Sequence, residues 1–358
     1  MKINIIGTVP PPIGGISVHI KRTKKFLDER EIESAVYNEA NWGREEDDIY
    51  PIKNYKFFMC RLPFLKADVF HFHSIDIKIR ILLGVYNFFG KKIILTVHGE
   101  SLTDQLKSSN FITRYLLLKS LNKLEKIICV NNSITNDLIQ FGIKHQKVIT
   151  VPGYIHPQED KKDILSIPET VWDFIKRTPF LISANGCVRF YKNEDLYGID
   201  MLIELMKKLK DNRIETSLLF AVLDKDSQTE LEKTYYQELK ERIIRYKLEN
   251  HIMFYEVENT EFYPILQKTN LFIRPTNTDG VGVSITEAIH YKVPSIASKV
   301  CERPTGTILF ESRNVDDLFE KVIKVIQNYN EYVDEISVIN NQDYAENLLS
   351  IYREVSSK

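Results

Sequence analysis

The sequence predicts an α/β protein made of two domains, each with a parallel sheet that is covered on both faces by helices. The chain has 358 residues, which is enough for two hydrophobic cores. Short apolar runs alternate with helical patterns in both halves, as in doubly wound sheets. A stretch from Val151 to about Trp172, with Pro152, Pro157 and Pro168, interrupts this alternation and reads as a linker. We therefore place one domain at residues 1–155 and the other at residues 156–334.

The first half begins with a buried-strand candidate, a glycine-rich turn and a helix. The turn contains Gly14 and Gly15, and the helical pattern runs from about Ser17 to Leu27. The spacing differs from the GxGxxG of dinucleotide-binding proteins, and an ordinary proline-stiffened turn would also fit. Strands in this half are expected at residues 3–6, 34–37, 68–72, 92–97, 126–130 and 147–151.

The second half repeats the alternation. Strands are expected at residues 180–184, 217–223, 251–255 and 271–273, and helices at 196–209, 229–246, 261–267, from Ser284 onward and at 315–329. The tail places Tyr344, Leu348, Leu349 and Tyr352 at helical spacing. In such parallel sheets the ligands lie at the carboxyl ends of the strands, so the loops after these strands are the places to look for a site.

Composition excludes some classes of function. Lys and Arg number 48 against 49 Asp and Glu, so bulk charge gives no reason to expect a nucleic-acid partner. The four cysteines, at positions 60, 129, 187 and 301, lack metal-ligand spacing and suggest free thiols in a reducing compartment. We find neither a signal-peptide pattern nor an apolar run long enough to span a membrane. The expected location is cytoplasmic, with the protein soluble or peripheral to a membrane.

The most informative stretch follows the strand at residues 271–273. A loop with Gly280 and Gly282 leads into a helix, and unpaired N–H groups at a helix start favour a phosphate. Asp279 and Glu287 add carboxylates that accept hydrogen bonds from sugar hydroxyls. A ligand with both hydroxyls and a diphosphate would suit all these groups. The alternative is structural, since Ser284 and Glu287 also fit a capping box.

This segment resembles the signature of the retaining family 4 glycosyltransferases, in which two acids separated by seven residues flank a glycine loop and an alanine, here Ala288, follows. The resemblance implies the GT-B fold, with two Rossmann-like domains facing a central cleft. It implies that Glu287 binds the nucleotide ribose and Asp279 the donor sugar. It also implies that the loop and helix start hold the diphosphate through Gly280, Gly282, Val283 and Ser284. The first acid of the family is more often Glu, and Asp279 is one methylene shorter.

Other donor-site residues follow from the same resemblance. Gly14 and Gly15 would lie beside the donor phosphates and the acceptor, and His98, in Thr96-Val97-His98-Gly99, would face the donor sugar. Tyr197 stands where the family has a diphosphate-binding lysine, so Arg189 and Lys192 are the nearest substitutes, and Arg274 is a further basic candidate. His71 and His73 stand on either side of Phe72 and are expected to point to opposite faces of the strand, so at least one of them should be structural.

The implied activity is transfer of a hexose-type sugar, with retention, from a nucleotide diphosphate sugar to a glycan or lipid-linked glycan in bacterial surface polysaccharide synthesis. UDP is the expected carrier by family habit. No cofactor or metal is expected, since Asp224-Lys225-Asp226 reads as a turn rather than a cation site. In the family the final helix, here about residues 335–358, returns to the first domain. The alternatives are a nucleotide-sugar 2-epimerase of the same fold and a non-catalytic partner subunit, which the departures at Tyr197 and Asp279 keep open.

Two stretches of the first domain combine basic and aromatic residues. They are residues 53–66 and 77–92. Basic amphipathic segments can lie in a membrane interface beside anionic lipid, which predicts peripheral contact with the inner face of the cell membrane. Ordinary helices that pack an apolar side on the sheet would give the same pattern.

Overall fold

The structure of the protein is a computed structural model that describes residues 1–40, 42–258, 260–280, 282–339 and 342–357. The chain divides into two compact units, Met1–Ile155 with Asp343–Lys358, and His156–Gln342. Residues 340, 341 and 358 of the predicted C-terminal segment lie outside the described residues. Among those described, no helix combines the length and apolar character needed to cross a bilayer.

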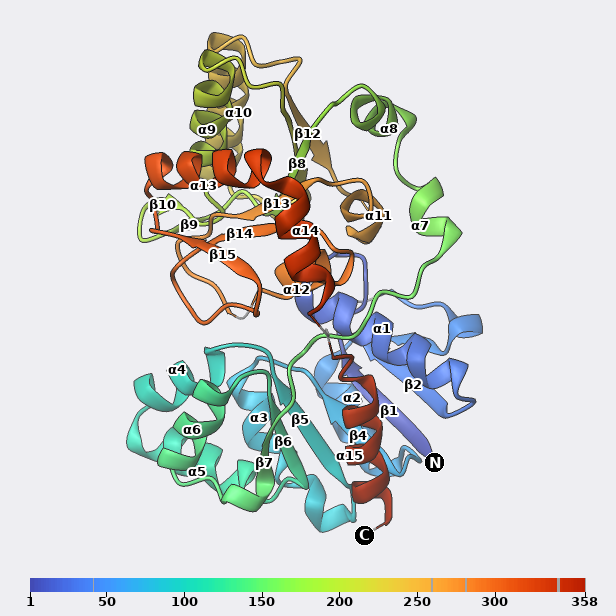
Figure 1. Ribbon diagram of the computed structural model, residues 1–358. Helices are drawn as coiled ribbons and strands as arrows, with labels where there is room; N and C mark the ends of the chain where they lie inside the picture. Colours follow the sequence, from blue (N-terminus) through green and yellow to red (C-terminus); the bar gives the residue numbers. More distant parts are fainter. Residues whose placement is uncertain (41, 259, 281, 340–341, 358) are drawn as a thin grey trace. The chain divides into compact units, whose positions relative to one another are not determined.

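The first unit is built on a seven-stranded parallel sheet in the order β3-β2-β1-β4-β5-β6-β7 (Figure 1). Its elements are β1 (Lys2–Gly7), α1 (Gly15–Glu29), β2 (Glu33–Asn38), β3 (Ile49–Pro51), α2 (Tyr55–Arg61), β4 (Val69–Phe72), α3 (Ile77–Leu83), β5 (Ile93–Val97), α4 (Ser101–Ser108), α5 (Phe111–Leu121), β6 (Lys126–Cys129), α6 (Asn132–Gln140), β7 (Val148–Thr150) and α15 (Ala345–Ser357). The predicted strands of this half are all present, and β3 is an additional edge strand.

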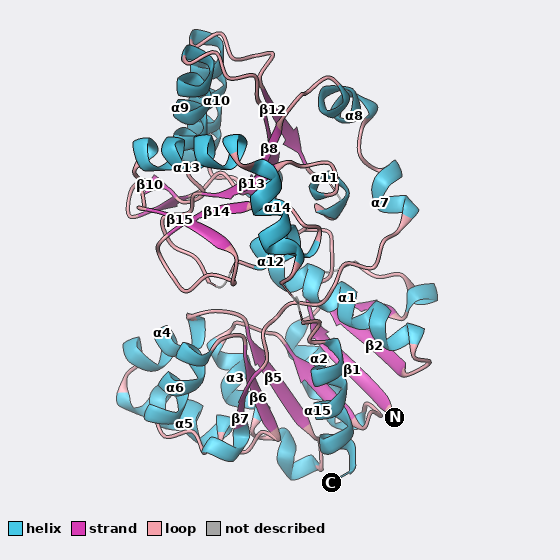
Figure 2. Cartoon of the chain, viewed as in Figure 1, coloured by secondary structure: helices cyan, strands magenta, loops and turns pink. Residues whose placement is uncertain are grey.

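Alternating side chains divide this sheet into two buried faces, as a period of two requires. Val69 of β4 packs in a core with residues of α1 and α15. Its neighbours Phe70 and Phe72 pack in another core with residues of α2 to α6. Helices therefore cover both faces (Figure 2), and α15, the last helix of the chain, completes the α1 face.

The second unit is built on a six-stranded parallel sheet in the order β12-β11-β8-β13-β14-β15. Its elements are α7 (Lys161–Leu165), α8 (Glu169–Lys176), β8 (Leu181–Gly186), β9 (Phe190–Tyr191), β10 (Glu194–Asp195), α9 (Ile199–Asp211), β11 (Ser217–Val222), α10 (Glu230–Arg245), β12 (Ile252–Glu256), α11 (Tyr263–Leu266), β13 (Leu271–Arg274), α12 (Val283–His290), β14 (Ser295–Ser298), β15 (Thr307–Phe310), α13 (Val315–Gln327) and α14 (Tyr329–Ser337). Helices α9, α10 and α13 share a core on one face, and α8, α11 and α12 on the other.

The structure adds elements that the sequence pattern did not predict. The stretch expected to be a linker contains α7 and part of α8, and the turn after β8 carries the small hairpin β9-β10. Strands β14 and β15 were also missed. Both are four residues long, which gives little room for a recognisable alternation.

Strand order locates the candidate sites. In each sheet the direction of winding reverses once, between β1 and β4 in the first unit and between β8 and β13 in the second. Ligands of doubly wound sheets bind beside the carboxyl ends of the strands at such a reversal. Those ends are Gly7 and Phe72 in the first unit, and Gly186 and Arg274 in the second.

Candidate active site

In the second unit, a glycine in a left-handed conformation starts helix α12. Gly282 is the N-cap residue with φ of +83°, a conformation that side chains with a Cβ avoid. The helix begins at Val283, and its N-cap makes no side-chain hydrogen bond. Ser284 thus lies inside the helix, and not at the N-cap position that the capping box considered for Ser284 and Glu287 requires. A helix start without a side-chain cap keeps N–H groups available for an anion.

Glu287 lies in the second turn of α12, and not in the first as the sequence suggested. Its side chain belongs to the buried set, with 6 % of its surface exposed. Ser284, one turn earlier, accepts a hydrogen bond from Nη1 of Arg274 at 3.1 Å. Helix α12 thus carries the buried carboxyl group of Glu287. Near its start it carries the Ser284 hydroxyl, which is hydrogen-bonded to Arg274.

Asp279 is held by two arginines. Nε and Nη2 of Arg274 donate to Oδ2 and Oδ1 of Asp279 at 2.5 and 3.0 Å, and Nη1 of Arg303 donates to Oδ2 at 2.7 Å. Burial alone would raise the pKa of Asp279, but Arg274 and Arg303 outweigh it and hold the pKa well below its ordinary value. Both oxygens are engaged, so Asp279 organises the arginines around it.

Arg303 is a site residue that sequence reasoning missed. Its side chain is only 2 % exposed, and it also donates to the carbonyl oxygen of Ser298 at 3.1 Å and to Oγ1 of Thr276 at 3.1 Å. Arg303 follows β14, which is the neighbour of β13 in the sheet. Had that short strand been recognised, the loop after it would have been expected at this edge. Two guanidiniums and one carboxylate leave this cluster with one surplus positive charge.

The end of strand β8 borders the same cluster. The Arg274 guanidinium lies 5.6 Å from the centroid of the Tyr197 ring, within reach of a cation–π contact. Tyr197, which replaces the expected lysine, packs so closely on Gly186 that a Cβ there would meet its ring at 2.2 Å. The Tyr197 ring thus fills the position where a lysine was expected. This ring contacts the guanidinium of Arg274, which comes from β13.

Asp195 fixes the loop that leads into α9. Its carboxylate accepts from the backbone N–H groups of Tyr197, Gly198 and Asp200 at 3.0 to 3.2 Å. Burial, reinforced by the nearby charge of Asp200, raises the pKa of Asp195 to about 6. Asp195 therefore positions Tyr197 through the backbone.

The two basic residues proposed as lysine substitutes lie elsewhere on this loop. Nη2 of Arg189 donates to Oδ2 of Asp224 at 2.7 Å, so Asp224 is an ion-pair partner and not simply a solvated turn acid. Lys192 has a positive φ of 51° and its Nζ lies 5.3 Å from the centroid of the Tyr191 ring. Arg189 and Lys192 remain predictions, whereas Arg274 and Arg303 lie in direct contact with Asp279.

In the first unit, Gly14 and Gly15 lie at the start of α1. Gly14 is the N-cap residue, and its N–H donates to Oγ of Ser17 at 2.9 Å. A Cβ added at Gly15 would meet no described atom within 4 Å. The turn therefore leaves open space over its backbone.

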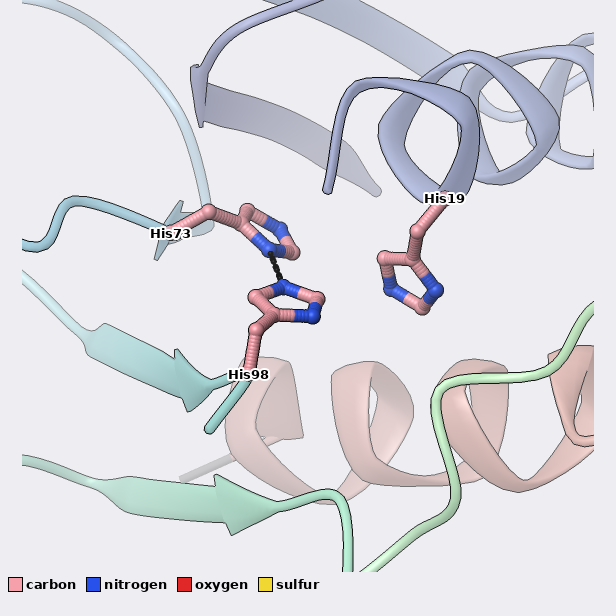
Figure 3. A group of neighbouring side chains, drawn as sticks. All are labelled: His19, His73 and His98. Carbon is pink, nitrogen blue, oxygen red and sulfur yellow. Dashed lines mark hydrogen bonds between the residues drawn. The ribbon is translucent and has the colours of Figure 1, made fainter. Parts of the chain in front are cut away.

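Four histidines meet at the carboxyl ends of β4 and β5. Nδ1 of His73 and Nε2 of His98 are 2.7 Å apart, and the His19 ring of α1 lies 5.1 Å from the His98 ring (Figure 3). His71 lies between the hydroxyls of Tyr352 and Thr96, at 2.6 and 2.7 Å, which is a structural role. The expected opposite orientation of His71 and His73 is wrong, because residues two apart on a strand share a face and their ring centroids lie 4.1 Å apart. Their roles nevertheless differ, since His73 contacts His98.

Close packing brings α1 to these strands. A Cβ on Gly7 would meet the end of the Ile20 side chain at 2.5 Å and Cβ of His73 at 3.1 Å, so a larger residue at position 7 would have to displace both. Burial lowers the pKa of His19 to about 4 and of His71 to about 3, and it lowers the pKa of His73 and of His98 well below the ordinary value. All four rings are neutral at pH 7.

Comparison with known proteins agrees with this architecture. The model of the glycosyltransferase family 4 matches residues 13–159, and the model of the group 1 glycosyl transferases matches residues 191–337. A comparison with curated proteins gives no match.

Solved structures share the fold over the whole chain. HepE of Anabaena in complex with UDP has a TM-score of 0.67 at 13% identity, over 100% of this chain and 99% of that one. A glycosyltransferase from Rickettsia africae has a TM-score of 0.70 at 16% identity, over 99% and 98%. Sucrose-phosphate synthase from Thermosynechococcus elongatus has a TM-score of 0.64 at 13% identity, over 99% of both chains. The chain has the GT-B fold and belongs to the family 4 glycosyltransferases, and it is a glycosyltransferase.

Proposed function

We propose that this enzyme transfers a hexose-type sugar, with retention of configuration, from a UDP-sugar to a glycan or lipid-linked glycan during surface polysaccharide synthesis. The observation that carries the proposal is the cluster of Arg274, Asp279 and Arg303 beside the uncapped start of α12. Its surplus positive charge and the helix N–H groups suit a diphosphate. UDP is favoured because HepE of Anabaena binds UDP and UDP-glucose on the same fold.

The residues of the second unit would bind the donor. The diphosphate lies against the backbone of Gly280, Gly282, Val283 and Ser284, and Glu287 accepts hydrogen bonds from the ribose. Asp279 is the residue expected to contact the donor sugar. Because its oxygens already accept from Arg274 and Arg303, we assign it mainly to holding those guanidiniums in place.

The residues of the first unit would bind the acceptor and the sugar. Gly14 and Gly15 are expected to bind beside the donor phosphates, for which the open space over Gly15 leaves room, and His98 is expected to hydrogen-bond the donor sugar. The acceptor oxygen forms a bond to the anomeric carbon on the face from which UDP departs. The bond from that carbon to the diphosphate breaks, and the departing phosphate oxygen takes the proton of the acceptor hydroxyl. In this scheme the charge that develops on UDP is stabilised by Arg274 and Arg303, with Arg189 and Lys192 as further candidates.

Transfer would need no divalent cation, because fixed guanidiniums provide the positive charge that the leaving group requires. They remain charged at any physiological pH. We therefore expect full activity in the presence of a chelator.

We also propose peripheral contact with the inner face of the cell membrane, which places the enzyme in the cytoplasm. The segments 53–66 and 77–92 expose Phe57, Phe64, Phe88 and Phe89, at 56 to 83 % of their surface. The adjacent helix α5 adds Phe111, Ile112 and Tyr115, at 55 to 83 %. Nζ of Lys123 lies 3.9 Å from the centroid of the Phe88 ring, so cations accompany these side chains. Exposed aromatics with basic neighbours suit an anionic lipid surface.

Vesicle sedimentation tests this contact. The variant Phe64→Ser with Phe88→Ser should bind vesicles containing phosphatidylglycerol at least about tenfold more weakly, since each phenylalanine contributes about 2 kcal/mol when buried. The matched control is Leu231→Ser on α10, an exposed apolar residue of the second unit. Equal binding by all three proteins would remove the membrane proposal.

The activity itself is tested by incubating the protein with a panel of nucleotide sugars, with and without glycan acceptors. Slow release of UDP by hydrolysis, accelerated by an acceptor and lost in Glu287→Gln, is the expected result. Recovery of an altered sugar still linked to its nucleotide would instead indicate a 2-epimerase. Neither release nor alteration with any donor would indicate a non-catalytic partner.

A further inference from the structure

The histidine cluster of the first unit has the composition of a transition-metal site. His19 comes from α1, His73 follows β4 and His98 follows β5, and Figure 3 shows their rings turned toward a common space. One ring nitrogen from each lies within 4.8 Å of the others. We propose that His19, His73 and His98 bind a Zn²⁺-like ion, and that the bound ion inhibits sugar transfer by occupying His98. The inhibitory part rests on the proposed function, whereas the binding part does not.

The His19 ring is already oriented as a metal ligand. Its Nδ1 lies 2.9 Å from the carbonyl oxygen of Gly153. A carbonyl only accepts, so Nδ1 carries the proton and Nε2 keeps a lone pair. A hydrogen bond from the second ring nitrogen to a backbone carbonyl is the usual support of a metal-bound histidine.

The pair His73 and His98 can supply the other two ligands. Among the described residues, Nε2 of His73 is buried and has no hydrogen-bond partner. Within that part of the chain, the contact with His98 is therefore the only hydrogen bond of the His73 ring. Each neutral ring can give one nitrogen to an ion and keep its proton on the other. Binding therefore needs no net loss of protons from the three rings.

The ligating atoms determine which class of metal ion suits this cluster. Three imidazoles without a carboxylate suit Zn²⁺, Co²⁺, Ni²⁺ or Cu²⁺, and they do not suit Mg²⁺ or Ca²⁺, which prefer oxygen ligands. Tetrahedral Zn²⁺ with bonds of about 2.0 to 2.1 Å would set the nitrogens about 3.3 Å apart. The three nitrogens, which lie within 4.8 Å of one another, must therefore adjust to this spacing, and the pair at 2.7 Å must widen. In the proposed complex, side-chain rotations would bring the nitrogens to this spacing, and a water molecule would be the fourth ligand.

Calorimetric titration of the full chain with ZnCl₂ after chelator treatment tests the site. The decisive variant is His19→Asn, because the asparagine amide can still donate to Gly153 while the Nε2 ligand is lost. We expect binding of one equivalent by the wild type, and binding weakened by at least about tenfold in His19→Asn. His73→Gln serves as a second variant in case the first does not fold, and the exposed His145→Asn should bind like the wild type. Absence of binding in the wild type would overturn the proposal. Binding as tight as that of the wild type in both His19→Asn and His73→Gln would also overturn it.

The transfer assay separates this inference from the proposed function. Zn²⁺ at one to two equivalents should suppress transfer in the wild type, and suppression in His19→Asn should need at least about tenfold more Zn²⁺. Mg²⁺ should have no effect on either protein. Zn²⁺ binding without suppression would contradict the inhibitory role of the ion. A protein that binds Zn²⁺ but transfers no sugar would contradict the proposed function and leave the binding site supported.

Discussion

The two units place chemically different clusters at the reversal points of their sheets. In the second unit, two largely buried arginines are neutralised in part by Asp279, so ionised groups are stabilised by one another. In the first unit, buried histidines contact one another and stay neutral, because burial lowers their pKa values. The difference supports the proposed division of roles, in which the second unit binds the charged diphosphate and the first offers neutral groups to a sugar or a metal ion.

Breaking the charged cluster should have the largest effect. Asp279→Asn leaves two nearly buried guanidiniums without their counter-ion, and we expect unfolding free energy to fall by about 3 to 5 kcal/mol. The control is Asp316→Asn, which removes an exposed pair with Lys208 and should cost less than about 1 kcal/mol. Urea denaturation measures both. A cost for Asp279→Asn as small as that of the control would show that the cluster contributes little.

The wild type and Asp279→Asn can also be compared as a function of pH. The folded-state pKa of Asp279 lies below the unfolded value of 3.8, so the stabilisation is fully present well above pH 3.8 and is lost as the pH falls below it. The stability difference between wild type and Asp279→Asn should therefore be constant from pH 6 to 8 and shrink below about pH 4. A difference that grows on acidification would have the wrong sign for this carboxylate.

Removing the charge of Glu287 should weaken donor binding. A hydrogen bond to a charged group contributes about 1.5 to 3 kcal/mol, so Glu287→Gln should bind UDP about 10 to 100 times more weakly. Calorimetry with UDP measures the change, and Glu258→Gln in the same unit is a control that should bind normally. Wild-type affinity in Glu287→Gln would count against the ribose contact.

A change in the first unit should separate turnover from donor affinity. His98→Ala should lower kcat by about tenfold or more through loss of a hydrogen bond to the sugar, while affinity for UDP, which lacks the sugar, stays unchanged. His145→Ala provides the matched surface control. Equal losses of UDP affinity and kcat in His98→Ala would place His98 against the nucleotide instead.

The smallest effect is expected at the edge of the second unit's site. Arg189 is 46 % exposed on its side chain and is already paired with Asp224. Arg189→Ala should therefore reduce UDP affinity by less than about tenfold. A larger loss would mean that Arg189 leaves Asp224 for the diphosphate and belongs among the principal donor-binding residues.

Sequence patterns predicted the parts of the site that are local. The sheet alternation, the glycine loop after β13 and the spacing of Asp279 and Glu287 could all be read within short windows. Arg303 could not, because it reaches Asp279 from a loop 24 residues away, after a strand too short to recognise. His19 was missed for a related reason. On a helix it looks like any polar residue, and only the packing of α1 beside the ends of β4 and β5 brings it to His73 and His98.

Binding of UDP and UMP, compared by calorimetry in the presence of EDTA, tests most directly whether Arg274 and Arg303 hold a diphosphate. Charge-assisted hydrogen bonds to the second phosphate should make UDP bind at least about tenfold more tightly than UMP. Arg303→Met, with the buried cation removed, should abolish most of that preference. Equal affinities for UDP and UMP in the wild type, or a preference that appears only when Mg²⁺ is added, would contradict the account.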